Sequence, residues 1–169
     1  MPISGHNPVE IVDMGLIHVP EGRKLFPNLS VKENLELGSY RRGKTNRAKN
    51  LERVLEIFPK LKDRIGQTAG TLSGGERQIL AISRALYFGA KILILDEPTS
   101  ALGVKESNKV VEQITNLKKQ NINVVLISHN IDQAFMLGDK FFVIKNGDLV
   151  AQLEKSETSA KSLRKILEK

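Results

Sequence analysis

The sequence has no cysteine, no tryptophan and only two tyrosines among its 169 residues. The lack of cysteine excludes disulfides and thiolate metal sites, as expected in a reducing compartment. The scarcity of stacking rings disfavours binding to single-stranded nucleic acid, and we expect no nucleic-acid partner. No apolar run approaches the roughly 18 to 20 residues that span a bilayer, and Met1–Gly15 lacks the pattern of a signal peptide. We therefore expect a soluble, cytosolic chain.

Length and composition predict one folded domain, since 40% of the residues are hydrophobic and 27% are charged. The net charge of +7 is unevenly distributed, with nine lysines and arginines between Arg41 and Arg64. We interpret this basic segment first as a solvated helix face. An anionic membrane surface and nucleic acid remain the alternative partners for it.

The spacing of apolar residues divides the chain into two parts. From Ser30 to Leu86 apolar residues recur at three- and four-residue intervals, which predicts helices. The expected buried faces are Ala48, Leu51, Leu55 and Phe58 in one helix, and Ile79, Ile82 and Leu86 in another. From Ile92 onward strands and helices alternate, which predicts an α/β fold with a mostly parallel sheet.

Short apolar runs indicate the strands. Two of them, Ile92–Leu95 and Val124–Ile127, suit buried parallel strands, and Leu16–Val19 is expected to be one brief strand. A hairpin is expected where Phe141–Ile144 and Leu149–Leu153 flank the turn pair Asn146-Gly147.

Further helices are expected between and beside these strands. Asn7 is a suitable cap for a short helix that begins at Pro8. The helix expected before the third strand has one apolar face, formed by Val110, Ile114 and Leu117. The last helix, Ser159–Leu167, has an apolar stripe that is expected to dock on the fold, formed by Leu163, Ile166 and Leu167. Because one brief strand precedes the long helical part, we expect the chain to be an N-terminally truncated fold.

The segment Leu72–Gln78 has the residues of a helix start that can approach an anion. Ser73 and Glu76 form an S-x-x-E capping box, which is worth about 1 kcal/mol. Gly74 and Gly75 let backbone N–H groups come close to a phosphate, where the helix dipole adds positive potential. The alternative interpretation is an ordinary capped helix with small residues for packing.

Two adjacent carboxylates, Asp96 and Glu97, end the strand that begins at Ile92. Such a pair can contact Mg²⁺ and an attacking water. Because neighbouring side chains on a strand point in opposite directions, we predict Asp96 in the metal shell, directly or through water, and Glu97 as the general base. A helicase would need Asp or His two residues after the glutamate, where this chain has Thr99.

The segments Leu72–Gln78 and Ile92–Thr99 together resemble the signature motif and the magnesium-binding strand of ABC-type ATPases. The resemblance extends along nearly the whole chain. It implies a P-loop NTPase-like core with an α-helical subdomain, ATP and Mg²⁺ as ligands, and a head-to-tail dimer. In that dimer the signature residues bind the ATP of the opposite subunit; they are Leu72, Ser73, Gly74, Gly75 and Glu76.

The same resemblance assigns roles to three other segments. Ser100, Ala101, Leu102 and Gly103 correspond to the D-loop, and Gly103 departs from the usual Asp, which puts the contact across the dimer in doubt there. His129 matches the switch histidine that senses the γ-phosphate, and we group it with Glu97 as catalytic. Glu21 falls at the Q-loop position, where most relatives have Gln. His6 and His18 match no motif and are expected to be structural.

The phosphate-binding loop of this family, G-x-x-x-x-G-K-[ST], matches one string, Gly38–Thr45. We interpret this match as a coincidence. The string follows Glu21 instead of preceding it, and the capping box of Ser30 and Glu33 opens a helix where a strand is required. We therefore expect the true loop to be missing from this sequence and the isolated chain to be inactive.

Within the family, the sequence resembles ATPase subunits of importers. Gly15–Arg23 and Leu25–Leu35 are similar to branched-chain amino acid importers, whereas Ala101–Ser107 and Leu126–Ile131 are more similar to monosaccharide importers. We place amino acids slightly ahead of sugars. The implied partners are transmembrane permease subunits and a second ATPase subunit, and the implied location is the cytoplasmic face of the plasma membrane.

The resemblance implies a single partial domain over residues 1–169, with four parts. These are the Q-loop region 16–29, the helical subdomain 30–88, the catalytic core 89–153 and a C-terminal helix 154–169. Two other classes stay open. A DNA-repair or chromosome ATPase shares the signature but would need long heptads between Glu21 and Ser73, which this sequence lacks. A non-catalytic remnant or regulatory module also fits a chain without the loop.

Overall fold

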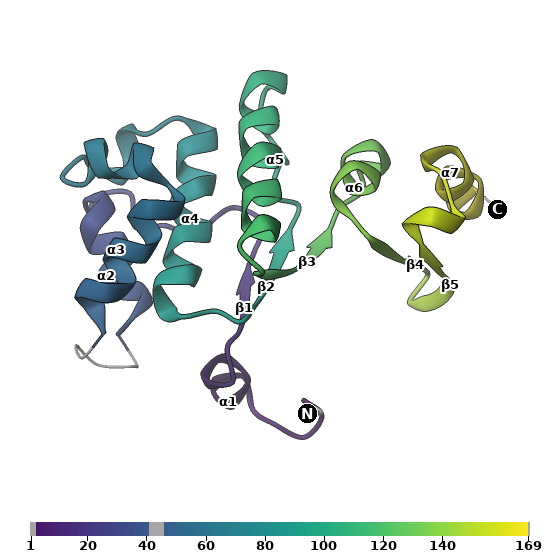
Figure 1. Cartoon of the computed structure of the whole chain (residues 1–169), viewed down its shortest axis with the longest axis horizontal. Helices are drawn as coiled ribbons and strands as arrows, with labels where there is room; N and C mark the ends of the chain where they lie inside the picture. Colours follow the sequence, from purple (N-terminus) through teal and green to yellow (C-terminus); the bar gives the residue numbers. More distant parts are fainter. Residues whose placement is uncertain (1–2, 41–45, 169) are drawn as a thin grey trace. The chain divides into compact units, whose positions relative to one another are not determined.

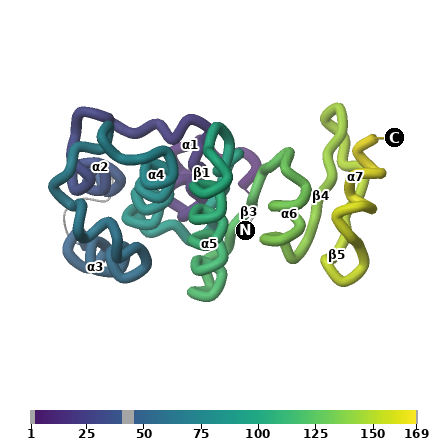
Figure 2. The backbone as a smooth tube through the Cα atoms, turned by 90° about the horizontal axis from the view of Figure 1, so that it is seen from above, coloured from purple at the N-terminus to yellow at the C-terminus, as the bar shows by residue number. Residues whose placement is uncertain are grey.

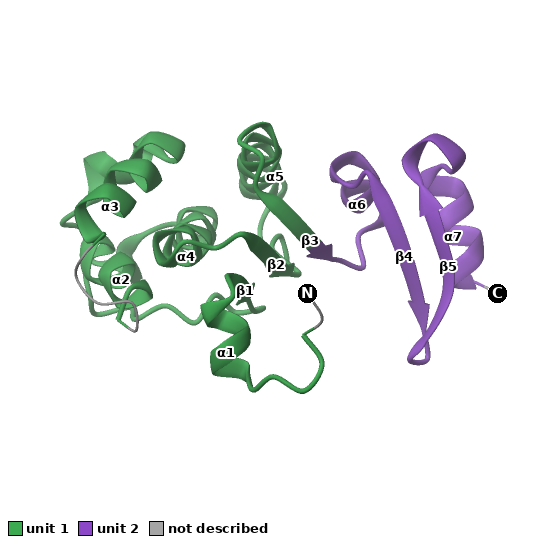
Figure 3. Cartoon of the chain, turned by 60° about the horizontal axis from the view of Figure 1, so that its bottom comes forward, with its two compact units in different colours: residues 1–125 green, residues 126–169 purple. Residues whose placement is uncertain are grey.

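The structure is a computed structural model that describes residues 3–40 and 46–168. The chain folds into two compact units, residues 1–125 and residues 126–169 (Figure 3). The predicted single domain and its internal boundaries stay a prediction.

The first unit begins with a short helix and a strand. Asn7 caps α1 (Pro8–Asp13) with a capping box, and Pro8 is its first residue, as predicted. β1 (Leu16–Val19) follows after Gly15, whose φ of +97° is a left-handed conformation that glycine adopts readily.

Between residues 30 and 88, leaving aside residues 41–45, the structure describes three α-helices and two short 3-10 helices. They are α2 (Val31–Gly38), α3 (Arg47–Ile57), η1 (Pro59–Arg64), η2 (Ala69–Thr71) and α4 (Gly74–Phe88). Both α2 and α3 pack against α4, and the three helices are neighbours in Figures 1 and 2. Ser30 and Ser73 begin α2 and α4 with the predicted capping boxes.

The predicted buried face of α3 is wrong in part. Ala48 is exposed, whereas Val54 and Ile57 are buried. The helix is rotated from the expected face because Val54, Ile57 and Phe58 fill the core together. In α4 the prediction holds better, since Ile82 and Leu86 are buried and Ile79 is half-buried.

The sheet of the first unit has the strand order β1-β2-β3. β2 (Ile92–Asp96) pairs with β1 in parallel, from Leu16 opposite Ile92 to Val19 opposite Leu95. β3 (Asn123–Ile127) carries the boundary between the two units. Leu93 and Leu95 are fully buried on one face of β2, as expected for an inner strand.

The helix α5 (Val104–Lys119) runs between β2 and β3. Its predicted apolar face is confirmed, because Val110, Ile114 and Leu117 are all buried. Helices beside a parallel sheet make an α/β fold, which confirms the predicted class.

The second unit contains α6 (Ile131–Leu137), the antiparallel pair β4 (Lys140–Lys145) and β5 (Asp148–Glu154), η3 (Lys155–Glu157) and α7 (Ala160–Glu168). Asn146 and Gly147 both have positive φ in the hairpin turn, as their residue types predict. Phe141, Val143 and Leu163 form the core, with Ile166 packed against it. Leu167 is 41% exposed, so it is not part of the docking stripe.

Within residues 3–40 and 46–168, no helix is both long enough and apolar enough to cross a membrane.

Candidate functional site

The start of α4 has the geometry predicted for the signature segment. The Ser73 N–H donates to Glu76 Oε2 at 2.9 Å, and the Glu76 N–H donates to Ser73 Oγ at 3.3 Å. Arg64 Nη2 lies 3.0 Å from Glu76 Oε1, which ties this carboxylate to η1. Leu72 is buried and Ser73 is exposed, so the buried leucine anchors the turn while the helix start remains at the surface.

The two glycines of this turn lie close to Leu102 and to Glu106 in the first turn of α5. A Cβ atom at Gly74 would lie 2.8 Å from Leu102 Cδ2 and 3.1 Å from Glu106 Oε2, and one at Gly75 would lie 3.3 Å from Glu106 Cβ. Close packing inside this chain is therefore one reason for glycine here, beside the predicted approach to phosphate. The contact also brings together two predicted site segments, the signature turn and the D-loop.

The turn after β2 presents the two predicted carboxylates. β2 ends at Asp96, and Glu97 has a φ of +44°, a left-handed conformation that is costly for a residue with a side chain. Pro98 is buried, and the Ser100 N–H donates to the Glu97 carbonyl at 3.0 Å, which closes the turn. Asp96 and Glu97 are both half-buried.

His18 lies beside Asp96, which motif matching did not anticipate. His18 Nε2 is 3.6 Å from Asp96 Oδ2, and the two side chains are 51% and 33% exposed. The parallel register places His18 opposite Ile94, two residues before Asp96 on the same face of β2. The strand register would have predicted this pair, whereas His18 matches no sequence motif.

The segment around Glu21 contacts both the turn after β2 and α4. Ser100 Oγ donates to Glu21 Oε1 at 2.9 Å across 79 residues of sequence. Arg23 Nε donates to Gln78 Oε1 at 3.2 Å. Burial lowers the pKa of the Arg23 guanidinium, and nearby Arg77 lowers it further, whereas Glu106 acts in the opposite direction. The structure thus joins the predicted Q-loop and D-loop residues, which the sequence did not reveal.

His129 belongs to the second unit, where it follows β3 and is exposed. The next residue, Asn130, caps α6 by accepting from the Gln133 N–H at 3.1 Å. Arg164 of α7 forms an ion pair with Asp132 in the first turn of α6. These contacts fix the helix that begins two residues after His129, and the role of His129 beside Glu97 stays a prediction.

The donor set at the end of β2 suits a magnesium ion that is bound together with phosphate. Mg²⁺ is usually held by one or two carboxylates plus substrate phosphates and water, and it needs no cage of protein ligands. Asp96 supplies a partly exposed carboxylate. Among the described residues no group of three or more His, Cys, Asp or Glu could hold a metal alone. The residues therefore fit a magnesium site in which Asp96 is one ligand and phosphate oxygens and water complete the coordination.

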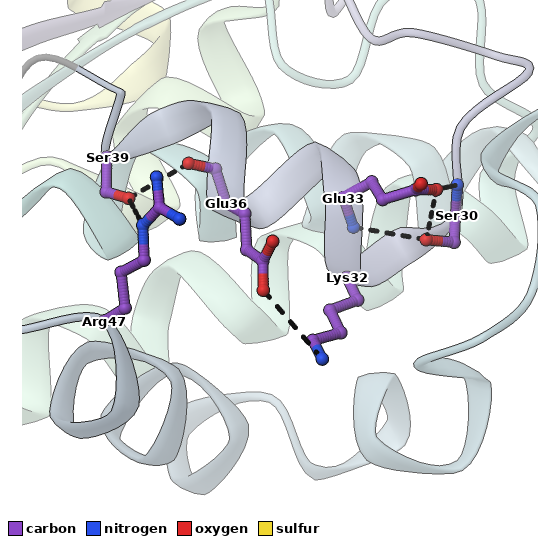
Figure 4. A network of polar contacts seen from close by, with 6 residues as sticks. All are labelled: Ser30, Lys32, Glu33, Glu36, Ser39 and Arg47. Atoms are coloured by element: carbon purple, nitrogen blue, oxygen red, sulfur yellow. Dashed lines mark hydrogen bonds and ion pairs between the residues drawn. The ribbon is translucent and has the colours of Figure 1, made fainter. Parts of the chain in front are cut away.

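The string Gly38–Thr45 begins at the end of a helix. Gly38 is the last residue of α2, and residues 41–45 lie outside the described part of the chain. Figure 4 shows Ser39 beyond α2, where its hydroxyl donates to the Glu36 carbonyl and accepts from Arg47 Nε, both at 3.0 Å. The predicted helix, where a phosphate-binding loop needs a strand, is confirmed.

Packing explains Gly38 without a ligand. A Cβ atom there would lie 2.5 Å from the backbone carbonyl oxygen of Arg84, closer than real contacts allow. The glycine therefore lets α2 approach α4 closely. This supports the interpretation of the string as a coincidence.

The chain is similar in sequence to proteins of one transporter family. The sequence profile described as ABC transporter matches residues 5–100. The high-affinity branched-chain amino acid transport ATP-binding protein BraG of Pseudomonas aeruginosa is 43% identical over 132 residues, which are 78% of this chain and 57% of the relative. The xylose/arabinose import ATP-binding protein XylG of Sulfolobus acidocaldarius is 32% identical over 167 residues, 96% of this chain and 66% of the relative.

Among solved structures, the ATP-binding cassette MJ0796, a dimer in a post-hydrolysis state bound to ADP and phosphate, matches with a TM-score of 0.69. The match has 25% identity and covers 88% of this chain and 68% of that one. The chain thus spans less than two thirds of the length of BraG and about two thirds of the length of XylG.

Proposed function

Because the chain belongs to the ABC transporter family, we propose that it is the signature-bearing and carboxylate-bearing part of an importer's ATP-binding subunit. The observation that carries the proposal is one pair of features in the first unit. An exposed, capped helix start at Ser73 occurs together with a left-handed turn that presents Glu97 at the end of a parallel strand.

In the complete subunit, Glu97 accepts the proton of the water that attacks the γ-phosphate. A general base of this kind contributes about 10²- to 10⁴-fold to a rate. His129 donates a hydrogen bond to the same phosphate, and Glu21 orients polar groups at the site from the Q-loop position. These roles follow from the match of each residue to the family's motifs.

Asp96 is the residue that would hold Mg²⁺, directly or through water. The ion would neutralise charge on the phosphate oxygens during hydrolysis. Within the chain itself, β2 ends at Asp96 and the backbone turns at Glu97, whose φ is +44°. This turn would let Asp96 serve the metal shell while Glu97 serves the water.

We propose that two ATP-binding subunits form a head-to-tail dimer. Each signature turn, Leu72–Glu76, would then dock on ATP held by the partner, with the D-loop residues Ser100–Gly103 beside it. The likeness to a cassette solved as a dimer supports this arrangement. The further partners are transmembrane permease subunits, and the subunit is peripheral on the cytoplasmic face of the membrane.

Branched-chain amino acids are the proposed solute, and monosaccharides are the second candidate. The first is supported by the 43% identity to BraG and the second by the match of 96% of this chain to XylG. The solute contacts the permease and a binding protein, so this chain carries no direct mark of it.

We further propose that residues 1–169 alone neither bind ATP tightly nor hydrolyse it. The family's phosphate loop has no counterpart here besides the Gly38–Thr45 string, whose first glycine has a packing role. The complete cassette, as used below, means this chain joined in frame to an upstream segment with a phosphate-binding loop.

Reconstitution tests the function and the solute together. The complete cassette is assembled with the permease encoded beside it, in vesicles, with the matching binding protein. We expect leucine, isoleucine or valine to stimulate ATP hydrolysis, with xylose and ribose as matched controls. Stimulation by the sugars alone would assign the second candidate, and absence of any hydrolysis would refute the ATPase function.

A further inference from the structure

The segment after Glu21 has an unusual backbone. Gly22, Arg23 and Lys24 have φ values of +78°, +65° and +46°, so three consecutive residues are left-handed. Two of them carry side chains, for which this conformation is costly. Such a segment persists only where its surroundings hold it, and so its contacts with other elements determine its shape.

Two of these contacts come from α4. Arg23 Nε donates to Gln78 Oε1 at 3.2 Å, and Arg84 Nη1 donates to the Lys24 carbonyl at 2.9 Å. Through these two hydrogen bonds, α4, the helix that begins at the signature turn, holds Arg23 and Lys24 in place.

The third contact comes from the turn after β2. Ser100 Oγ donates to Glu21 Oε1 at 2.9 Å, and Ser100 is half-buried while Glu21 is exposed. Ser100 is therefore the more enclosed of the two hydrogen-bonded residues.

The position of Ser100 is set by the same turn that presents Glu97. The Ser100 N–H donates to the Glu97 carbonyl at 3.0 Å, and Ala101 on the other side has a φ of +53°. Ser100 is therefore hydrogen-bonded both to the backbone of Glu97 and to the Glu21 carboxylate.

We propose that Ser100 is a positioning residue, whose hydroxyl fixes the Glu21 carboxylate to the turn that carries Glu97. The residues 21–24 and the turn 97–101 then shift together as one piece. The proposal rests on the proposed function only for its catalytic consequence, because the hydrogen bond is a property of the chain itself.

The first experiment needs no nucleotide. Amide hydrogen exchange is measured by NMR on the 169-residue chain and on Ser100→Ala, Ser100→Thr and Glu21→Gln. Ser100→Ala should speed exchange at the Arg23 and Lys24 amides by about 2- to 10-fold, which corresponds to one typical net hydrogen bond. Thr retains the donor and Gln retains an acceptor oxygen, so both variants should stay near the parent chain.

Exchange in the middle of α4, at Leu80 and Ile82, serves as the control and should not change. Unchanged exchange at Arg23 and Lys24 in Ser100→Ala would overturn the proposal. If Ser100→Ala speeds exchange along the whole chain, the Ser100→Thr variant decides. Exchange at Arg23 and Lys24 that returns to the parent rate in Ser100→Thr supports the proposal, and exchange that stays fast there overturns it.

The second experiment uses the complete cassette. Ser100→Ala should lower kcat by about 2- to 10-fold and leave the KM for ATP within about twofold, because the lost contact positions the site and does not hold the phosphates. Ser100→Thr should restore kcat. An increase in KM at constant kcat would contradict the positioning role. If the cassette hydrolyses no ATP at all, the proposed function fails while the exchange experiment still decides this inference.

Discussion

The helical section of the first unit, residues 30–88, and the turns at the ends of its strands hold their side chains by different means. In the helical section, Ser30 and Ser73 form capping boxes with residues three positions away, and the core helices are deeply buried. At the strand ends, Glu97 and Ala101 are left-handed, and their neighbours contact residues far away in sequence. The first arrangement depends on local sequence, and the second depends on the assembled fold.

The two regions also differ in how far particular apolar side chains are exposed. Ile92 and Val125 on the strands are 37% and 50% exposed, whereas Leu80 and Ile82 of α4 are fully buried. We therefore expect substitutions in the helical section to act on stability and docking, and those at the strand ends to act on chemistry.

The largest expected effect is the loss of turnover when the proposed general base, Glu97, is replaced. In the complete cassette, Glu97→Gln should lower turnover about 10²- to 10⁴-fold while ATP still binds, because an amide cannot act as a general base. The matched control is Glu56→Gln, at an exposed glutamate of α3 outside the site residues, which should retain most of the activity. Steady-state hydrolysis and nucleotide titration measure both. Half of the parent turnover in Glu97→Gln would remove Glu97 as the base.

The second prediction concerns the signature turn. Gly75→Asp adds volume and a negative charge where the partner's ATP is expected to dock, so ATP-dependent dimers of the complete cassette should be lost while the monomer remains folded. Gly75→Ala adds only the volume, and its Cβ would lie 3.3 Å from Glu106 Cβ, so it should weaken the dimer less. Light scattering measures the dimer. ATP-dependent dimers of Gly75→Asp would contradict the assigned docking face.

The third prediction tests the packing role of Gly38. In Gly38→Ala the new Cβ would meet the Arg84 carbonyl at 2.5 Å, and overpacking of this kind costs about 1 to 3 kcal/mol. The gain from replacing a helical glycine by alanine, roughly 0.5 to 1 kcal/mol, does not offset a backbone collision. Urea unfolding gives the free energy of unfolding. Gly66→Ala is the control, since nothing lies within 4 Å of its Cβ. Equal stability of both variants would refute the close approach.

The smallest expected difference is in the dynamics of the unmodified chain. Amides in the middle of α4, near Leu80 and Ile82, should exchange about tenfold more slowly than those of β1 and β2, because the helix is capped and buried while the strands have exposed apolar side chains. The exposed strand surface should also make the chain prone to association. Strands as protected as α4, in a monodisperse monomer, would show that the two regions do not differ.

The sequence predicted the elements whose signals are local. The caps at Asn7, Ser30 and Ser73 depend on residues three positions apart, and the turn at Asn146-Gly147 depends on two residues that tolerate positive φ. The contacts His18–Asp96 and Glu21–Ser100 were not predicted, because they depend on strand register and on how separate loops pack. The buried face of α3 was predicted wrongly in part for the same reason, because tertiary packing buries Val54 and leaves Ala48 exposed.

The central claim is that this chain supplies the signature turn and the catalytic carboxylates, and that residues 38–45 do not hold phosphate. Isothermal titration of Mg–ATP into the 169-residue chain and into the complete cassette, each with and without Lys44→Ala, tests it directly. We expect no micromolar binding to the chain alone and equal micromolar binding to the two cassettes. Micromolar binding to the chain alone, abolished by Lys44→Ala, would contradict the account.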